Sequence, residues 1–134
     1  MKVQYVSPEY TVQVWPKVKK FLEPAMAYSN GEFNLDQAQV YVNEGIWSLI
    51  VVVNETDIQG AVLVKFFNYA NERVAFVMAI GGRLISNHDT FEQLKQICKL
   101  KGATIIEGAA RESVARMWRK YGFAEKYRIV GVKL

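Results

Sequence analysis

Cysteine, histidine and proline are scarce in this sequence of 134 residues. It has one cysteine, Cys98, one histidine, His88, and three prolines. A single cysteine excludes an internal disulfide and any multi-cysteine metal site, so we expect no bound metal. The position of Cys98 among helical apolar residues favours a buried small side chain over a nucleophile.

Long hydrophobic runs and an excess of one charge are also missing. No apolar run approaches the roughly 20 residues of a membrane helix, and Met1–Tyr5 leads into no signal-peptide core. The 17 basic and 13 acidic residues give a net charge of +4 without forming one block, which permits an anionic ligand but does not require nucleic acid. We therefore expect one soluble, cytoplasmic domain over residues 1–134, with 51% hydrophobic residues to build its core.

The hydrophobic period alternates between strand and helix along the chain. Helical spacing, capping residues and terminating glycines predict helices over Pro8–Tyr28, Leu35–Glu44, Thr90–Lys101 and Glu112–Tyr121. Alternating or β-branched runs predict strands over Lys2–Val6, Ile46–Val53, Ile58–Asn68, Arg73–Ile80, Ala103–Glu107 and Tyr127–Leu134. Helices segregated around a mixed sheet make an α+β fold, with about four helices and six or seven strands.

The stretch Tyr121-Gly122-Phe123 ends an amphipathic helix just before the last predicted strand. Gly122 is suited to the left-handed conformation that ends a helix, and Phe123 to folding back onto the core. This ending, in this order of elements, resembles the GNAT fold of N-acetyltransferases over nearly the whole chain.

The chain is also similar to small GNAT-like proteins encoded by bacteriophages. The matching pieces are Val14–Val18, Asn43–Trp47, Ala79–Gly82 and Arg111–Phe123. This second resemblance implies a phage protein that acts in virion assembly, as an internal virion component or in binding a host protein, in the host cytoplasm or the virion.

The GNAT resemblance implies an acetyl-coenzyme A site along the fourth strand and the start of the next helix. The residues it points to are Met78, Ile80, Gly81, Gly82, Arg83 and Asn87. Free amides and the helix dipole favour phosphate at such a helix start. The spaced glycines of the family's loop, Gln/Arg-x-x-Gly-x-Gly/Ala, are missing after Gly82, however, and Asp89 opposes phosphate. The alternative for Gly81-Gly82 is a turn that ends a strand.

Catalytic residues are harder to find. The family's acid, a tyrosine four residues before the glycine of the Gly-Phe pair, is Trp118 here, and an indole cannot act as a general acid at neutral pH. Tyr121 is the nearest tyrosine, and Glu107, at a strand end, is the candidate base if burial raises its pKa. His88 is expected to be a solvated loop residue.

Two functions remain open from the sequence. The degenerate loop and Trp118 favour a GNAT-fold protein without catalysis, acting through a phage or host protein. The intact order of elements keeps an active N-acetyltransferase, moving acetyl from acetyl-CoA to an amine, as the alternative. The basic residues of 111–120 are expected to be a solvated helix face rather than an RNA-binding patch.

Overall fold

The valine-rich segment after Trp47 lies in the middle of an antiparallel meander. The computed structural model describes residues 1–83 and 87–134, in which five strands form one sheet in the order β1-β2-β3-β4-β5. The strands are β1 (Lys2–Val6), β2 (Ser48–Asn54), β3 (Asp57–Asn68), β4 (Arg73–Gly82) and β5 (Ile105–Gly108). Only β5 runs parallel to its neighbour, β4, so the sheet is mixed, as the sequence predicts.

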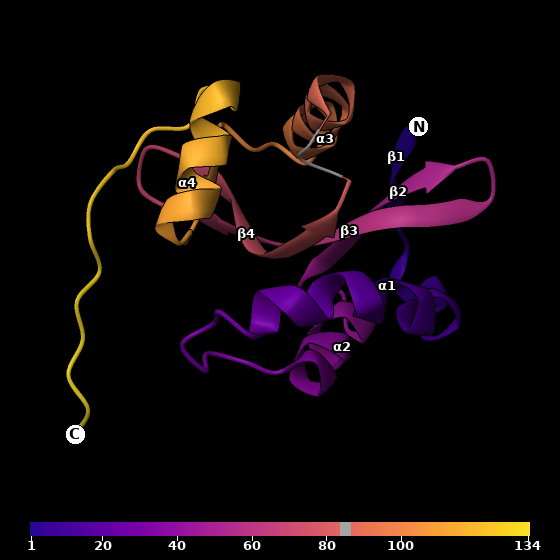
Figure 1. The fold of residues 1–134 in the computed structure, drawn as a ribbon, viewed down its shortest axis with the longest axis horizontal. Helices are drawn as coiled ribbons and strands as arrows, with labels where there is room; N and C mark the ends of the chain where they lie inside the picture. The colour runs from indigo at the N-terminus through magenta and orange to yellow at the C-terminus, as the bar shows by residue number, and fades with distance from the viewer. Residues whose placement is uncertain (84–86) are drawn as a thin grey trace.

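Two helices cover each face of this sheet (Figure 1). On one face lie α1 (Thr11–Met26), which follows a 3-10 turn at Pro8–Tyr10, and α2 (Leu35–Asn43). On the other lie α3 (His88–Leu100) and α4 (Glu112–Trp118), which continues into a 3-10 turn at Arg119–Tyr121. The helices confirm the predicted positions to within about two residues, the usual uncertainty of helix ends.

Local signals in the sequence fix several of these boundaries. Asn34 and Gln37 form a complete capping box at the start of α2, with the Gln37 amide donating to Asn34 Oδ1 over 2.8 Å. At the other end of the chain, Gly122 has φ 92°, the left-handed conformation that ends the helical turn after α4. Phe123 then packs on Trp118, with 5.0 Å between the ring centroids.

The core forms one layer on each side of the sheet. Buried members of these layers include Leu22, Leu49, Val51, Leu63, Leu94 and Trp118. Other large side chains are partly buried and pack against them: Phe21, Met78, Ile106, Met117 and Phe123. No helix of the described residues is long and apolar enough to cross a membrane.

The predicted strand over Tyr127–Leu134 is wrong for the single chain. Residues 124–134 lie in neither helix nor strand and run away from the body of the molecule (Figure 1). The described residues therefore make five strands instead of six or seven. A strand needs a neighbour for its backbone hydrogen bonds, and this segment has none within the described chain.

Candidate functional site

The one parallel pair of strands, β4 and the edge strand β5, separates halfway along β4. Strand β5 pairs with β4 only from Val74 to Val77, and the pairing ends where Val77 lies beside Gly108. At the same point the β3–β4 register shifts by one residue, because Leu63 pairs with Ala79 and Val64 with Val77. Met78 is thus the extra residue of a β-bulge, a feature that bends a strand and ends regular pairing. Beyond it, β4 has a neighbour on one side only.

The second half of β4 consequently presents backbone groups to an open side. The amide of Arg83 donates to Gln59 O on β3 over 3.0 Å. Since backbone groups alternate between the two sides of a strand, those of Gly82 and Ile80 face the opposite side, toward β5. No strand pairs with them there within the described residues.

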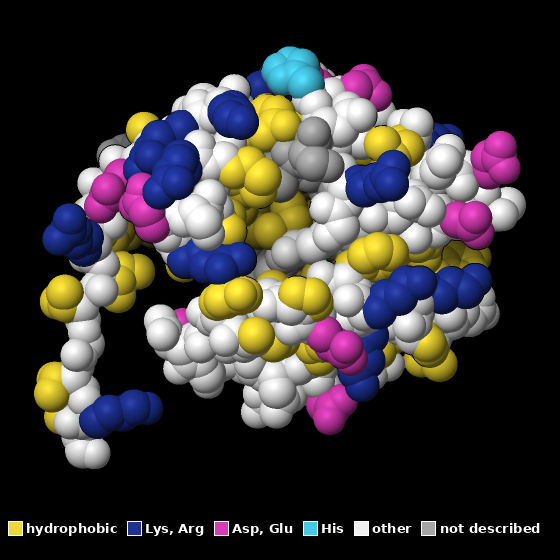
Figure 2. Space-filling view, viewed as in Figure 1, with side chains coloured by type: hydrophobic (Ala, Val, Ile, Leu, Met, Phe, Trp, Pro, Cys, Tyr) yellow, Lys and Arg dark blue, Asp and Glu magenta, His cyan; other side chains and the backbone are white. Residues whose placement is uncertain are grey.

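A hollow overlies this part of the sheet. Figure 2, in the same view as Figure 1, shows it between the layer of α3 and α4 and the layer of α1, with hydrophobic side chains on its floor. An apolar hollow beside unsatisfied backbone groups is suited to a ligand with an apolar arm and a few amide or carbonyl groups.

Trp118, at the end of α4, lies beside the point where β4 and β5 stop pairing. Its ring lies against Gly108, where an added Cβ would be 2.8 Å from the indole. The side chain is only 4% exposed, and Nε1 has no hydrogen-bond partner among the described residues. A buried indole N–H without an acceptor is costly, and since less than 1 Å² of this nitrogen is exposed, a ligand reaches it only when neighbouring groups move. The expected core packing of Trp118 is confirmed, and it leaves the N–H unused.

The glycine pair at the end of β4 packs against α1. A Cβ on Gly81 would lie 1.7 Å from the backbone oxygen of Phe21, and one on Gly82 would lie 2.4 Å from Gln59 O. Gly82 also has φ 79°, which strains other residues. Close contact between helix and strand is therefore sufficient to explain both glycines, and a role in phosphate binding stays a prediction.

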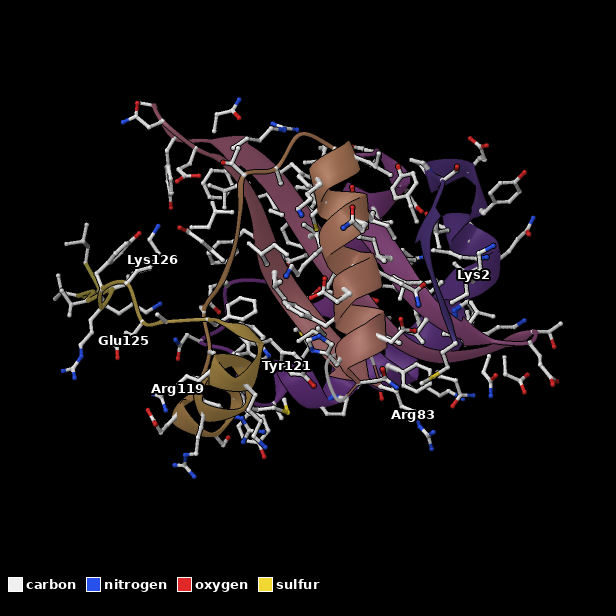
Figure 3. All side chains as sticks on the ribbon, turned by 90° about the horizontal axis from the view of Figure 1, so that it is seen from above. Lys2, Arg83, Arg119, Tyr121, Glu125 and Lys126 are labelled. Atoms are coloured by element: carbon white, nitrogen blue, oxygen red, sulfur yellow. The ribbon has the colours of Figure 1, made fainter. Side chains whose placement is uncertain are left out.

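Asn87 caps the helix that the predicted phosphate site would use. Its Oδ1 accepts from the amides of Asp89 over 2.8 Å and Thr90 over 3.3 Å, so two of the first amides of α3 are already bonded. Gln93 Nε2 donates to Asp89 Oδ2 over 3.0 Å. Figure 3 shows Arg83 extending outward near the start of α3, and its role in phosphate binding stays a prediction. The middle of the predicted site, residues 84–86, lies outside the described residues.

Glu107 is buried and carries two partners. Its side chain is 8% exposed, Tyr69 donates a hydrogen bond to Oε1 over 3.1 Å, and Lys126 forms an ion pair with Oε2. A hydrogen bond with Tyr127, burial and the Glu107 carboxylate raise the pKa of Tyr69 to about 12. The hydrogen bond to Glu107 raises the pKa of Lys126 as well. In this arrangement both carboxylate oxygens of Glu107 are engaged by other side chains.

Comparison with solved structures places this geometry in a known fold. A probable acetyltransferase superposes with a TM-score of 0.71 at 15% identity, over 100% of this chain and 97% of that one. The chain has the GNAT fold. A predicted acetyltransferase from Clostridium acetobutylicum, solved with acetyl-CoA, gives a TM-score of 0.66 at 9% identity, over 98% of this chain and 95% of that one.

A third similar structure is an aminoglycoside acetyltransferase from an uncultured soil metagenomic sample. It has a TM-score of 0.69 at 12% identity, over 99% of this chain and 94% of that one. No protein-family model and no curated protein matches the sequence. At these identities the neighbours establish the GNAT fold, and the phage origin of the chain stays a prediction.

Tyr121 faces α3 instead of the end of β5. Its ring stacks near His88 at 6.0 Å between centroids and near Phe91 at 4.9 Å, and Figure 3 shows it between α4 and α3. It lies three residues past Trp118, in the 3-10 turn that follows α4. His88 is solvent-exposed, as expected, with 75% of its side chain accessible and Glu92 3.9 Å away, but it is the first residue of α3 and not a loop residue.

Two residues of the Glu107 cluster were not predicted from sequence. Tyr69 comes from the turn between β3 and β4 and Lys126 from the segment after α4, 38 and 19 residues from Glu107. No short spacing links the three, so only the three-dimensional arrangement reveals them. Cys98, in contrast, is buried as predicted, and burial raises the pKa of its thiol to about 11, which suppresses its reactivity.

The basic face of residues 111–120 is partly engaged by other side chains. The guanidinium of Arg111 lies 3.5 Å from the ring centroid of Tyr28, and Arg119 pairs with Glu112 at 3.4 Å. These are ordinary surface contacts of a helix face, in line with the non-RNA interpretation.

Proposed function

We propose that the protein binds acetyl-coenzyme A in the hollow where β4 and β5 diverge and transfers the acetyl group to a primary amine. The observation that carries this proposal is the end of pairing at Val77 and Gly108, together with the bulge at Met78. These leave a strand edge beside an apolar hollow, which suits the amide-containing arm of the cofactor. The solved GNAT neighbour with acetyl-CoA supports the same assignment.

The chain offers two donors for the reacting group. When bound, acetyl-CoA supplies an activated thioester whose carbonyl oxygen gains negative charge as an amine attacks. The backbone N–H of Ile80, on the open side of β4, is the candidate donor to that oxygen. The orphaned N–H of Trp118 is the candidate donor to the sulfur. An indole holds its proton, so Trp118 stabilises a departing thiolate without protonating it.

The candidate general base, Glu107, is engaged by other side chains and is not free to accept a proton from the amine. Since Lys126 and Tyr69 engage Glu107, the amine must arrive already neutral or Lys126 must move away. We therefore expect the rate to rise with pH until the acceptor amine itself is deprotonated. A free carboxylate base would instead give a rise near its own, lower pKa.

The test combines binding with transfer. Isothermal titration with acetyl-CoA is followed by an assay of thiol release with several amines, including a peptide with a free N-terminus and the aminoglycoside sisomicin. The second is included because an aminoglycoside acetyltransferase of this fold was solved with that compound. Trp118→Phe keeps a ring and removes the donor, so we expect retained binding and a kcat about 10- to 100-fold lower. Unchanged kcat would remove Trp118 from the mechanism.

A second candidate is a GNAT-fold protein that acts through protein binding without catalysis, including the predicted phage role. The neutralising contact of Lys126 with Glu107 and the occupied amides of Asp89 and Thr90 favour it. Binding of acetyl-CoA without release of the coenzyme A thiol in the presence of any of the amines, or no binding at all, is the outcome that this candidate predicts.

A further inference from the structure

The segment 124–134 has the properties of a strand without a partner. It extends away from the rest of the molecule (yellow in Figure 1), and the views in Figures 1 and 3 agree on this. Ile129, Val130 and Val132 are 81%, 90% and 85% exposed. Such β-branched side chains are typical of paired strands, and a folded protein rarely leaves several adjacent ones in water.

The alternation of this segment gives it one aliphatic face. Val130, Val132 and Leu134 lie on the same side of an extended chain, because side chains two residues apart point the same way. Arg128 precedes them on this side, and the opposite side carries Tyr127, Ile129, Gly131 and Lys133. This is the pattern of a strand that covers apolar surface with one face.

The sheet offers an open edge for such a strand at β5. Strand β5 is the last in the order and pairs only with β4 among the described residues. The opposite edge of the sheet is partly protected, because Gln93 accepts from the amide of Val3 over 2.9 Å and donates to Met1 O over 3.1 Å. Unpaired edges attract strands from other chains, and of the two outermost strands of the described sheet β5 is the one for which no such side-chain cover is seen.

Charge also matches the segment to this edge. Lys126, Arg128 and Lys133 make the segment basic. The β5 side of the sheet is acidic at Glu107 and Glu72, and Glu72 Oε2 accepts from Thr104 next to β5. Lys126 already pairs with Glu107, which places the beginning of the segment next to β5.

We propose that residues 127–134 of one copy pair with the outer edge of β5 in a second copy, and that the exchange is reciprocal. The Lys126 contact holds the segment at its own β5, and the chain then leaves that edge instead of following it. A reciprocal exchange satisfies both open edges and both exposed segments in one two-fold dimer. The predicted last strand of the sequence then forms between chains.

The first test is the mass in solution. Light scattering after size-exclusion chromatography should give a dimer of about twice the 15.3 kDa chain at micromolar concentration. The double variant Val130→Glu, Val132→Glu should be monomeric. Val40→Glu is the matched control, since Val40 is also exposed, at 53%, but lies on α2. This control should remain dimeric.

The second test locates the contact by amide hydrogen exchange. In the dimer the amides of 128–134 should be protected, and the double variant should lose this protection while the strands of the body keep theirs. A monomeric wild-type protein would overturn the proposal, and protected 128–134 amides in that monomer would mean that the segment pairs with its own β5. A dimer that survives the double substitution would also overturn it, because its interface would lie elsewhere. None of these outcomes depends on acetyl-CoA binding.

Discussion

Substituting Gly81 by alanine should separate the packing role of this glycine from a role in cofactor binding. The Cβ of an alanine would lie 1.7 Å from the backbone oxygen of Phe21, in the middle of α1. An ordinary carbon–oxygen contact is about 3.5 Å, so α1 and β4 must separate by about 1.5 Å or more. A backbone carbonyl cannot rotate away as a side chain can.

The expected loss of stability in Gly81→Ala follows from the side chains that α1 buries against the sheet. Val18 and Leu22 on this helix are fully buried, and a gap of 0.5–1 Å already forfeits about a quarter to a half of each contact energy. Overpacking commonly costs about 1–3 kcal/mol, and a backbone clash belongs at the upper end, about 3 kcal/mol. With an unfolding entropy of about 2.1 cal/mol/K per residue over 134 residues, this lowers Tm by about 10 °C.

Urea and thermal unfolding, each followed by circular dichroism, measure this effect. Val12→Ala is the control on the same helix, because the side chain of Val12 is 69% exposed, and it should change stability by less than about 0.5 kcal/mol. A Gly81→Ala protein of wild-type stability would refute the packing argument. If that variant also bound acetyl-CoA more weakly, Gly81 would be a cofactor residue.

Two further predictions concern the side chains around β5. Trp118→Ala should lower the unfolding free energy by about 3–5 kcal/mol in urea titrations, and Trp118→Phe by clearly less, because the latter keeps the ring contact with Phe123. Equal losses would show that the contact with Phe123 does not account for the stabilisation, and no loss in either variant would show that the indole is not packed. Because the pKa of Tyr69 is raised from 10.0 to about 12, its contribution to stability should be complete below pH 10 and lost as pH rises through 12. Urea midpoints between pH 9 and 12 should therefore fall more steeply for the wild type than for Tyr69→Phe, and parallel curves would contradict the shift.

Most of the fold could be predicted because its signals are local. The capping box at Asn34, the left-handed Gly122 and the change of hydrophobic period at the meander each depend on a few neighbouring residues. The failed strand over Tyr127–Leu134 has an equally good local pattern. Pairing is not a local property, and the partner of this segment is absent from the single chain.

The candidate site was predicted less well, because its features depend on distant contacts. Met78 reads as an ordinary strand residue, and only the register with β3 makes it a bulge. Glu107 was chosen as a strand end, but its pairing with Lys126 and Tyr69 changes its chemistry. The sequence shows Trp118 where GNAT acetyltransferases often carry a tyrosine. That the indole N–H of Trp118 has no hydrogen-bond partner among the described residues can be seen only in the three-dimensional structure.

Binding of acetyl-CoA to the open edge of β4 is the central claim, and isothermal titration tests it most directly. We expect a micromolar Kd that is weakened at least tenfold by Ile80→Pro, which removes the N–H on the open side and leaves the β3 pairs of Ala79 and Gly81 in place. The melting temperature without ligand serves as the folding control for this variant. No heat at millimolar acetyl-CoA, with a folded wild-type protein, would contradict the account.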